Sequence, residues 1–201
     1  MKAKLSIELS KVSDFDNPKI ELEQYRTPPE LAADILHTAF MQGDIEGKKV
    51  IDLGTGTGIF AIGAALLGAE VTAVDKDNEA LELAEKNAER LGVSESIEFV
   101  EENVEDFQGE FDTAVMNPPF SVHSDIGIRF FEKAVEIVDT VYSVAHPGSQ
   151  SSIKDFVENS NHVIEALEEY KVALPPTYGF HTEESRETRV DVIITRDKDG
   201  A

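Results

Sequence analysis

The sequence predicts an α/β fold in which seven strands form a mostly parallel sheet with helices on both faces. Two observations support this prediction. Short runs rich in β-branched residues alternate with amphipathic helical segments, which is the order of a doubly wound sheet. The first run, residues 49–53, continues into a glycine-rich turn at residues 54–58 and then into an Ala- and Leu-rich helix. A strand, a glycine turn and a helix in this order open the phosphate- or nucleoside-binding part of such folds.

The composition is that of a globular protein and limits its location. With 201 residues, 41% of them hydrophobic, the chain is long enough for one domain spanning residues 1–201. We expect residues 1–20 to form an N-terminal extension and residues 196–201 a loose tail. We expect neither a membrane anchor nor a signal segment, because no apolar run is long enough. Since Cys is absent, disulfides and thiolate metal sites are excluded, and we expect a cytoplasmic location.

The chain is strongly acidic. Its 18 basic and 40 acidic residues give a formal net charge of −22 at pH 7. The simplest interpretation is a solvated acidic surface. Such a surface repels the phosphate backbone of a nucleic acid unless salt screens the charge, a local basic patch exists or a basic partner helps.

A polar and aromatic loop precedes the first predicted helix. Gln24, Tyr25 and Thr27 lie in this loop. Thr27 is a favourable N-cap, Pro28 suits the first helical position, and Glu30 stands where a capping box requires a carboxylate. Taken alone, the loop is explained by helix capping and an exposed Tyr.

The sequence of the turn after the first strand excludes two common kinds of nucleotide-binding site. The dinucleotide fingerprint requires a third glycine where the chain has Ile59, and no Lys-Ser/Thr pair follows as in a P-loop. The second strand, residues 70–75, ends in Asp75, about twenty residues beyond Gly54. At this spacing a carboxylate can accept hydrogen bonds from a ribose diol.

A helix and a third strand follow. Residues 79–91 form an amphipathic helix, and residues 97–100 have the composition of a strand. Asn103 and Val104 come directly after this strand. The Asn can bond the edge of an adenine, and the Val can cover its face.

The fourth strand, residues 111–116, ends in Asn117-Pro118-Pro119-Phe120. Proline lacks a backbone N–H and cannot join a strand ladder, so the sheet must release the chain here. The Asn117 side chain and the freed carbonyls then face the carboxyl edge of the sheet, where open α/β folds bind ligands. Taken alone, the tetrapeptide fits a simple Pro-Pro turn equally well.

The remaining segments complete the predicted sheet. A helix capped by Ser124 extends to about residue 138, and a short helix is expected at residues 153–158. The last three strands are expected at residues 141–145, 163–173 and 188–195.

In combination, these features resemble the class I S-adenosylmethionine-dependent methyltransferases that methylate amines. More narrowly, the chain is similar to the archaeal and eukaryotic family of small-subunit rRNA adenine-N6 methyltransferases (methyltransferase-like protein five). The narrower resemblance rests on Glu23-Gln24-Tyr25-x-Thr27-Pro28, Asn117-Pro118-Pro119-Phe120 and Tyr178-x-Phe180-His181. It implies a Rossmann-like sheet whose last strand is antiparallel, and rRNA as the substrate. The family also uses a small zinc-binding activator protein.

The resemblance implies a role for each motif. S-adenosylmethionine would contact Gln24, Tyr25, Thr27, Asp52, Gly54, Gly56, Asp75, Asn103, Val104 and Asn117. The substrate would contact Phe120, Phe180 and His181, and His123 is a further candidate from its place after the Asn-Pro-Pro-Phe motif. No metal site is expected, because the acids are scattered and the His residues lie far apart in the sequence.

The implied chemistry needs few side chains, and Asn117, Pro118, Pro119 and Phe120 are the candidate catalytic residues. The exocyclic amine of adenine is a weak nucleophile because its lone pair is delocalised into the ring. If Asn117 Oδ1 and the Pro118 carbonyl each accept one N–H, the nitrogen is held pyramidal with its lone pair aimed at the methyl group. Phe120 would stack on the flipped base, a contact worth about 1–3 kcal/mol.

Two other functions stay open at this point. A protein-glutamine N5 methyltransferase has a similar motif, usually with Tyr where the chain has Phe120, and the acidic surface would suit a release-factor substrate. A non-catalytic cofactor-binding subunit is the other alternative, against which the intact Asn117 and Gly56 argue. The chain departs from the rRNA family at Arg26 and at residues 182–185, which lack the basic residues expected for an RNA contact.

Overall fold

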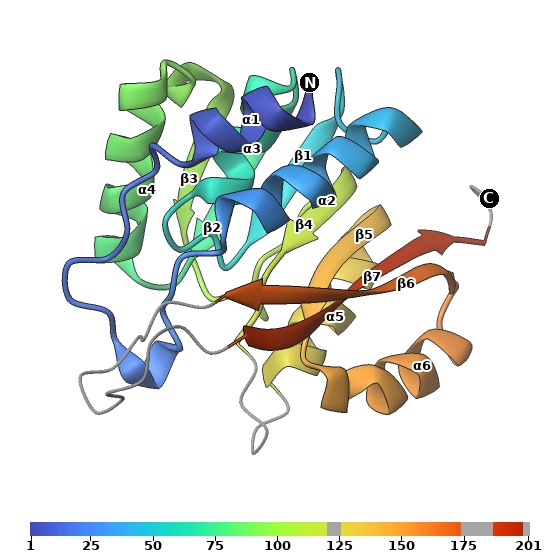
Figure 1. Ribbon diagram of the computed structural model, residues 1–201. Helices are drawn as coiled ribbons and strands as arrows, with labels where there is room; N and C mark the ends of the chain where they lie inside the picture. The colour runs from blue at the N-terminus through green and yellow to red at the C-terminus, as the bar shows by residue number, and fades with distance from the viewer. Residues whose placement is uncertain (120–125, 174–186, 199–201) are drawn as a thin grey trace.

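In the described part of the chain, seven strands form one mixed sheet. The computed structural model describes residues 1–119, 126–173 and 187–198. The strands are β1 (Lys49–Leu53), β2 (Glu70–Asp75), β3 (Ile97–Glu101), β4 (Phe111–Met116), β5 (Val138–Ala145), β6 (His162–Ala173) and β7 (Glu187–Asp197). They lie in the order β3-β2-β1-β4-β5-β7-β6 (Figure 1).

The pairing of the strands confirms the predicted mostly parallel sheet. β1 pairs in parallel with β2 on one side and β4 on the other, and β3 and β5 extend the parallel part outward. β7 is antiparallel to both of its neighbours, β5 and β6, with Ser143 of β5 opposite Ile193. The parallel strands therefore bring their carboxyl ends to one edge of the sheet, where ligands bind in such folds.

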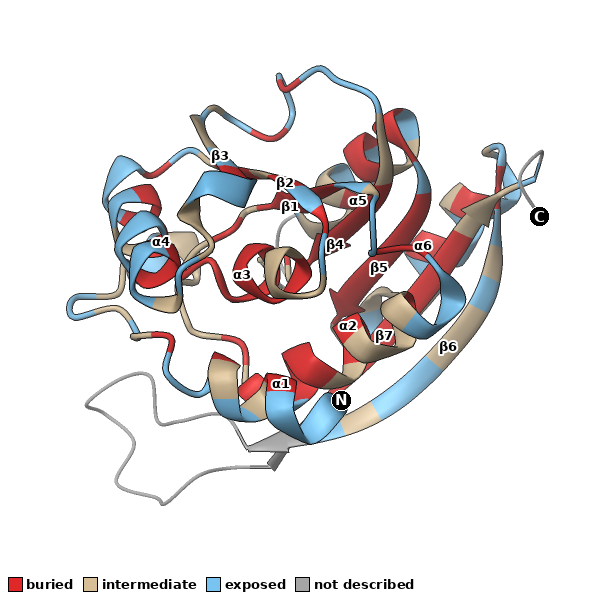
Figure 2. Ribbon diagram, turned by 90° about the horizontal axis from the view of Figure 1, so that it is seen from above, coloured by how far each residue is buried: buried red, intermediate tan, exposed pale blue. Residues whose placement is uncertain are grey.

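Helices cover both faces of the sheet (Figure 2). They are α1 (Lys2–Leu9), α2 (Pro29–Gln42), α3 (Ile59–Leu66), α4 (Asn78–Leu91), α5 (Ile126–Ile137) and α6 (Gln150–Glu158), with short 3-10 turns at η1 (Ile20–Leu22), η2 (Ser94–Ser96) and η3 (Pro147–Ser149). Successive residues of a strand face opposite sides, so Val50 packs with α1–α4, whereas Ile51 and Leu53 pack with α5 and α6. Among the described residues, no helix is long and apolar enough to cross a membrane.

The N-terminal extension expected at residues 1–20 begins with a helix that packs against the rest of the fold. Its first turns form α1, whose Leu5 and Leu9 are buried against α2 and α3, and Val12 is buried just beyond the helix. Two leucines spaced by four residues give a helix of this length only a narrow apolar stripe. The helix therefore depends on tertiary packing, which the local pattern does not reveal.

The C-terminus corrects the expectation of a loose tail over residues 196–201. β7 continues through Asp197, and Arg196 lies opposite Thr140 of β5. The next residue, Lys198, donates its backbone N–H to the Asn161 carbonyl. At least the first three residues of the expected tail are therefore held by hydrogen bonds, and residues 199–201 lie outside the described part of the chain.

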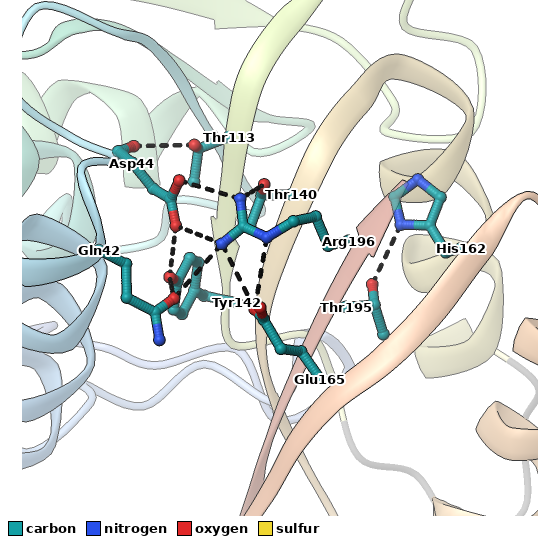
Figure 3. A network of polar contacts seen from close by, with 9 residues as sticks. All are labelled: Gln42, Asp44, Thr113, Thr140, Tyr142, His162, Glu165, Thr195 and Arg196. Atoms are coloured by element: carbon teal, nitrogen blue, oxygen red, sulfur yellow. Dashed lines mark hydrogen bonds and ion pairs between the residues drawn. The ribbon is translucent and has the colours of Figure 1, made fainter. Parts of the chain in front are cut away.

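Arg196 is the centre of a polar network that joins the end of β7 to the loop between α2 and β1 (Figure 3). Its guanidinium donates to both carboxylate oxygens of Asp44, at 3.1 and 2.9 Å, and lies 3.3 Å from Glu165. Tyr142 donates its hydroxyl to Asp44 at 2.7 Å. Burial and this carboxylate raise the pKa of Tyr142, so the hydroxyl stays a donor.

Candidate functional site

A pocket opens at the carboxyl ends of β1, β2, β3 and β4. The turns after these strands supply Gly54, Gly56, Asp75, Lys76, Asn103, Val104, Glu105, Asn117 and Pro119. The segment before α2 and the start of α5 complete its wall with Phe15, Glu21, Leu22, Glu23, Gln24, Tyr25, Ile126 and Phe130. The carboxyl edge that the sequence predicts as the ligand site is thus where the structure has a concave site.

The glycine turn brings backbone close to the pocket. Gly54 and Gly56 have φ angles of +73° and +54°, which favour glycine. A Cβ on Gly54 would lie 2.8 Å from Cε1 of Phe130 on α5, so a side chain there requires that ring to move. Gly54 also donates its N–H to the Val74 carbonyl at 2.8 Å, which fixes the turn against β2.

The Asp75 side chain lines the pocket and is fixed by two backbone donors. Its two oxygens accept backbone N–H groups, Oδ2 from Gly56 and Oδ1 from Asp77, each at 3.0 Å. Burial raises the pKa of Asp75, and the two N–H groups oppose that shift. A carboxylate has about four lone-pair sites, so Asp75 keeps acceptor capacity for a ligand.

Asp52 lies beneath the pocket and not on its wall. It is 1% exposed and accepts the Thr55 hydroxyl at 2.7 Å and the Ala61 N–H at 3.0 Å. These bonds join the end of β1, the glycine turn and α3. Burial raises the pKa of Asp52 to about 7. Asp52 therefore supports the turn in this structure, and the direct cofactor contact expected for it stays a prediction.

The segment before α2 is tied to the N-terminus of α4 beside the pocket. Gln24 donates to one oxygen of the Asp77 side chain at 2.6 Å and accepts the Lys19 N–H at 2.9 Å. Lys19 Nζ lies 2.7 Å from the other oxygen of Asp77. Asp77 also caps α4 by accepting the Glu79 N–H. Asp77, which caps α4, thus also holds Gln24 at the pocket wall.

Sequence reasoning missed a second tie between the N-terminal segment and α4. Asn87 is 1% exposed, accepts the Ser13 N–H at 2.9 Å and donates to the Thr57 carbonyl at 3.0 Å. It therefore connects the N-terminal segment to the end of the glycine turn. The sequence feature that could have predicted this contact is the amide of Asn87, which stands on the apolar face of the helix next to Ala84 and Ala88. A buried amide requires partners, and these had to come from elsewhere in the chain.

The Asn117 amide is held at both ends. Its Nδ2 donates to Thr27 Oγ1 at 2.9 Å, and its Oδ1 accepts the Tyr25 hydroxyl at 3.3 Å. The predicted N-cap role of Thr27 is wrong, because α2 begins at Pro29 after an extended Pro28 and has no side-chain cap. Thr27 is 4% exposed and uses its hydroxyl for Asn117. The loop before α2 thus orients the amide at the end of β4.

Comparison with known proteins identifies the family. The Methyltransferase small domain (MTS) family model matches residues 29–173, well over half of the chain. The chain belongs to the Methyltransferase small domain family.

Full-length relatives agree with this assignment. The rRNA N(6)-adenosine-methyltransferase METTL5 of Danio rerio is 34% identical to this methyltransferase over 92% of the chain and 93% of the relative. The crystal structure of a putative RNA methyltransferase, PH1948 from Pyrococcus horikoshii, superposes with a TM-score of 0.89 at 37% identity, covering 98% of this chain and 97% of that one. Both matches span the fold from end to end.

A match to the glutamine-methylating alternative is only partial. The release factor glutamine methyltransferase of Chlorobaculum tepidum is 39% identical, but over 51% of this methyltransferase and 36% of its own length. The shared part is therefore a fragment of each protein, and the full-length relatives support the adenine-methylating family more strongly.

Most of the predicted cofactor residues of this methyltransferase meet at the pocket: Gln24, Tyr25, Gly54, Gly56, Asp75, Asn103, Val104 and Asn117. Pro119 also lines it, whereas Pro118 is buried. Phe120, His123, Phe180 and His181, like the expected cap Ser124, lie outside the described residues. Within the described ranges, no group of three or more His, Cys, Asp or Glu residues could hold a metal ion.

Proposed function

We propose that this chain transfers a methyl group from S-adenosylmethionine to the exocyclic N6 amine of an adenine in small-subunit rRNA. The observation that carries the proposal is the Asn117 amide. It lines the pocket at the carboxyl edge of the sheet, with its carbonyl oxygen bonded to Tyr25 and its NH₂ group bonded to Thr27. Family membership and the full-length resemblance to an rRNA adenine methyltransferase support the same reaction.

The pocket residues fit S-adenosylmethionine. Gly54 and Gly56 line the pocket with backbone alone, so a flat nucleoside can approach that backbone beside the Phe130 and Phe15 rings. Asp75 offers a fixed carboxylate to a ribose diol, and Asn103 and Val104 stand where they can bond and cover an adenine. When bound, the cofactor supplies an electrophilic methyl group on a sulfonium.

The chain's own contribution is to hold the target amine. Asn117 Oδ1 accepts one hydrogen bond from Tyr25, and an amide oxygen has a second lone pair for an amine N–H. The Pro118 carbonyl, which follows directly, would accept the other N–H. Two acceptors placed in advance orient the nitrogen lone pair without a side-chain base. Phe120, His123, Phe180 and His181 would contact the flipped base and its neighbours.

The acidic charge bears on how RNA reaches this site. At long range, a chain of net charge −22 repels phosphate unless salt screens the charge. A small zinc-binding activator that adds a strand to the sheet, at β3 or β6, would supply surface that the chain lacks. We propose that this complex acts in the cytoplasm. Native mass spectrometry of the two co-expressed proteins tests the partnership, and two separate species would contradict it.

The substrate is tested by methyl transfer in vitro. The protein is incubated with isotope-labelled S-adenosylmethionine and, in separate reactions, with small-subunit rRNA and with a release-factor protein. Digestion to nucleosides and mass spectrometry should find labelled N6-methyladenosine in the RNA. Label on a glutamine of the release factor instead would transfer the assignment to the alternative. Label in neither, with intact cofactor binding, would indicate a non-catalytic subunit.

A further inference from the structure

We infer that Thr27 is a positioning residue that holds the NH₂ end of Asn117 away from the reacting amine. The inference rests on the proposed function and deepens it. Thr27 lies on the loop before α2 and Asn117 at the end of β4, 90 residues apart in the chain. The donor-acceptor distance of 2.9 Å makes this the shorter of the two hydrogen bonds to the amide, because the Tyr25 bond measures 3.3 Å.

The two ends of an amide have opposite hydrogen-bonding properties. The carbonyl oxygen accepts, whereas the NH₂ group only donates. The N–H groups of the target amine need the amide oxygen of Asn117 as their acceptor. If the amide turned by 180°, these N–H groups would face the NH₂ group of Asn117, which is also a donor. The orientation of Asn117 therefore decides whether the site can hold the amine.

Thr27 provides the condition under which the productive orientation is stable. Thr27 is only 4% exposed, so water has little access to the NH₂ group of Asn117 beside it, and that group needs an acceptor from the protein. Thr27 Oγ1 is that acceptor. Without it the NH₂ group would be buried and unpaired, which is costly, and would turn toward the open pocket. Any hydroxyl can donate to the amide oxygen or accept from the NH₂ group, so Tyr25 would not prevent this turn once Thr27 is replaced. The Thr27 hydroxyl makes the observed orientation possible because it accepts from the NH₂ group there.

The experiment compares Thr27→Val, which removes the hydroxyl at nearly constant shape, with Thr27→Ser, which keeps it. Thr113→Val is the matched control. Thr113 is also buried, at 1% exposure, and its hydroxyl donates to the Asp44 carbonyl at 2.8 Å near the opposite end of β4. Each purified variant is assayed for kcat and KM with rRNA, for cofactor Kd by calorimetry and for Tm.

We expect Thr27→Val to lower kcat by about tenfold or more, with cofactor Kd within about twofold of the wild-type value. Thr27→Ser should recover most of kcat. Thr113→Val should lower Tm and leave kcat unchanged below the transition. A wild-type kcat in Thr27→Val would overturn the inference, as would equal losses of kcat in Thr27→Val and Thr113→Val.

A second measurement does not depend on turnover. Nuclear magnetic resonance of ¹⁵N-labelled protein reports the exchange of the Asn117 side-chain NH₂ with water. We expect protection in the wild type and in Thr27→Ser, and faster exchange in Thr27→Val. Equal exchange in all three proteins would contradict the inference. Failure of the proposed function is seen separately, as absence of N6-methyladenosine in the wild-type reaction.

Discussion

The Asp75 carboxylate accepts the backbone N–H of Gly56 at 3.0 Å. This bond joins the end of β2 to the glycine turn that follows β1, so the acid expected to bind a ribose also shapes the loop beside it. A second bond, from the Asp77 N–H, fixes the other oxygen of Asp75. The binding group is thus oriented before any ligand arrives, which lowers the ordering cost of binding.

Asp75→Asn should therefore weaken cofactor binding. An amide keeps one acceptor and turns a donor toward either Gly56 or Asp77, whose N–H groups are donors themselves. Hydrogen bonds to charged groups contribute about 1.5–3 kcal/mol, so we expect the cofactor Kd to rise by about 10- to 100-fold. Calorimetry measures the change. Asp112→Asn, at the far end of β4, is the control and should bind as the wild type does.

Asn117→Ala should strongly lower turnover and keep cofactor binding. The variant removes the acceptor proposed for the target amine, while Asp75 and the glycine turn stay intact. Loss of one preorganised hydrogen-bonding group at a reacting centre typically lowers kcat by about 100- to 1,000-fold. Single-turnover assays with rRNA, beside a calorimetric titration with the cofactor, separate the two effects. Methyl transfer at the wild-type rate would refute the role of the amide.

Arg196→Met should destabilise the fold. It leaves the Asp44 carboxylate, which is 8% exposed, without its bidentate partner. Removing one member of a buried ion pair costs about 3 kcal/mol, and urea unfolding should show a midpoint lowered accordingly. Arg189→Met is the control, because its side chain is 66% exposed and lies 3.8 Å from Glu169. It should change the free energy of unfolding by less than about 1 kcal/mol. Equal losses in the two variants would contradict a special role for the network.

Asp52 should make stability depend on pH. Its pKa rises from 3.8 to about 7 on folding because the carboxyl is buried. Between about pH 4 and 7 the folded protein holds a proton that the unfolded chain has lost. The free energy of unfolding contributed by this group is therefore complete below pH 4 and is lost as the pH rises to 7, with a slope of at most about 1.4 kcal/mol per pH unit.

Unfolding curves of Asp52→Asn and the wild type at several pH values test this. Other acids of this chain contribute to the slope in both proteins, so the difference between the two slopes isolates Asp52. Asp139→Asn, at an exposed position on β5, is the control and should keep the wild-type slope. The same slope in Asp52→Asn as in the wild type would show that the buried carboxyl does not hold the proton.

The sequence by itself determined the sheet and most of the pocket. Gly54, Gly56, Asp75 and Asn117 follow from local rules: a strand ends where proline removes the N–H, a turn with positive φ requires glycine, and parallel strands end at one edge. These rules act within a few residues, so they can be applied without knowing the fold. The same reasoning predicted the antiparallel last strand only through the resemblance to a family.

Only the tertiary structure decided which distant residues hold the site and the ends of the chain. Thr27 bonds to Asn117 across 90 residues, Ser13 to Asn87 across 74, and Asp44 to Arg196 across 152. Local patterns assigned Thr27 to a helix cap and Arg196 to a loose tail, because each has a plausible local role. A buried polar group bonds to whatever partner the packing of the chain brings within reach. That choice depends on how the loops close, and no short stretch of sequence contains it.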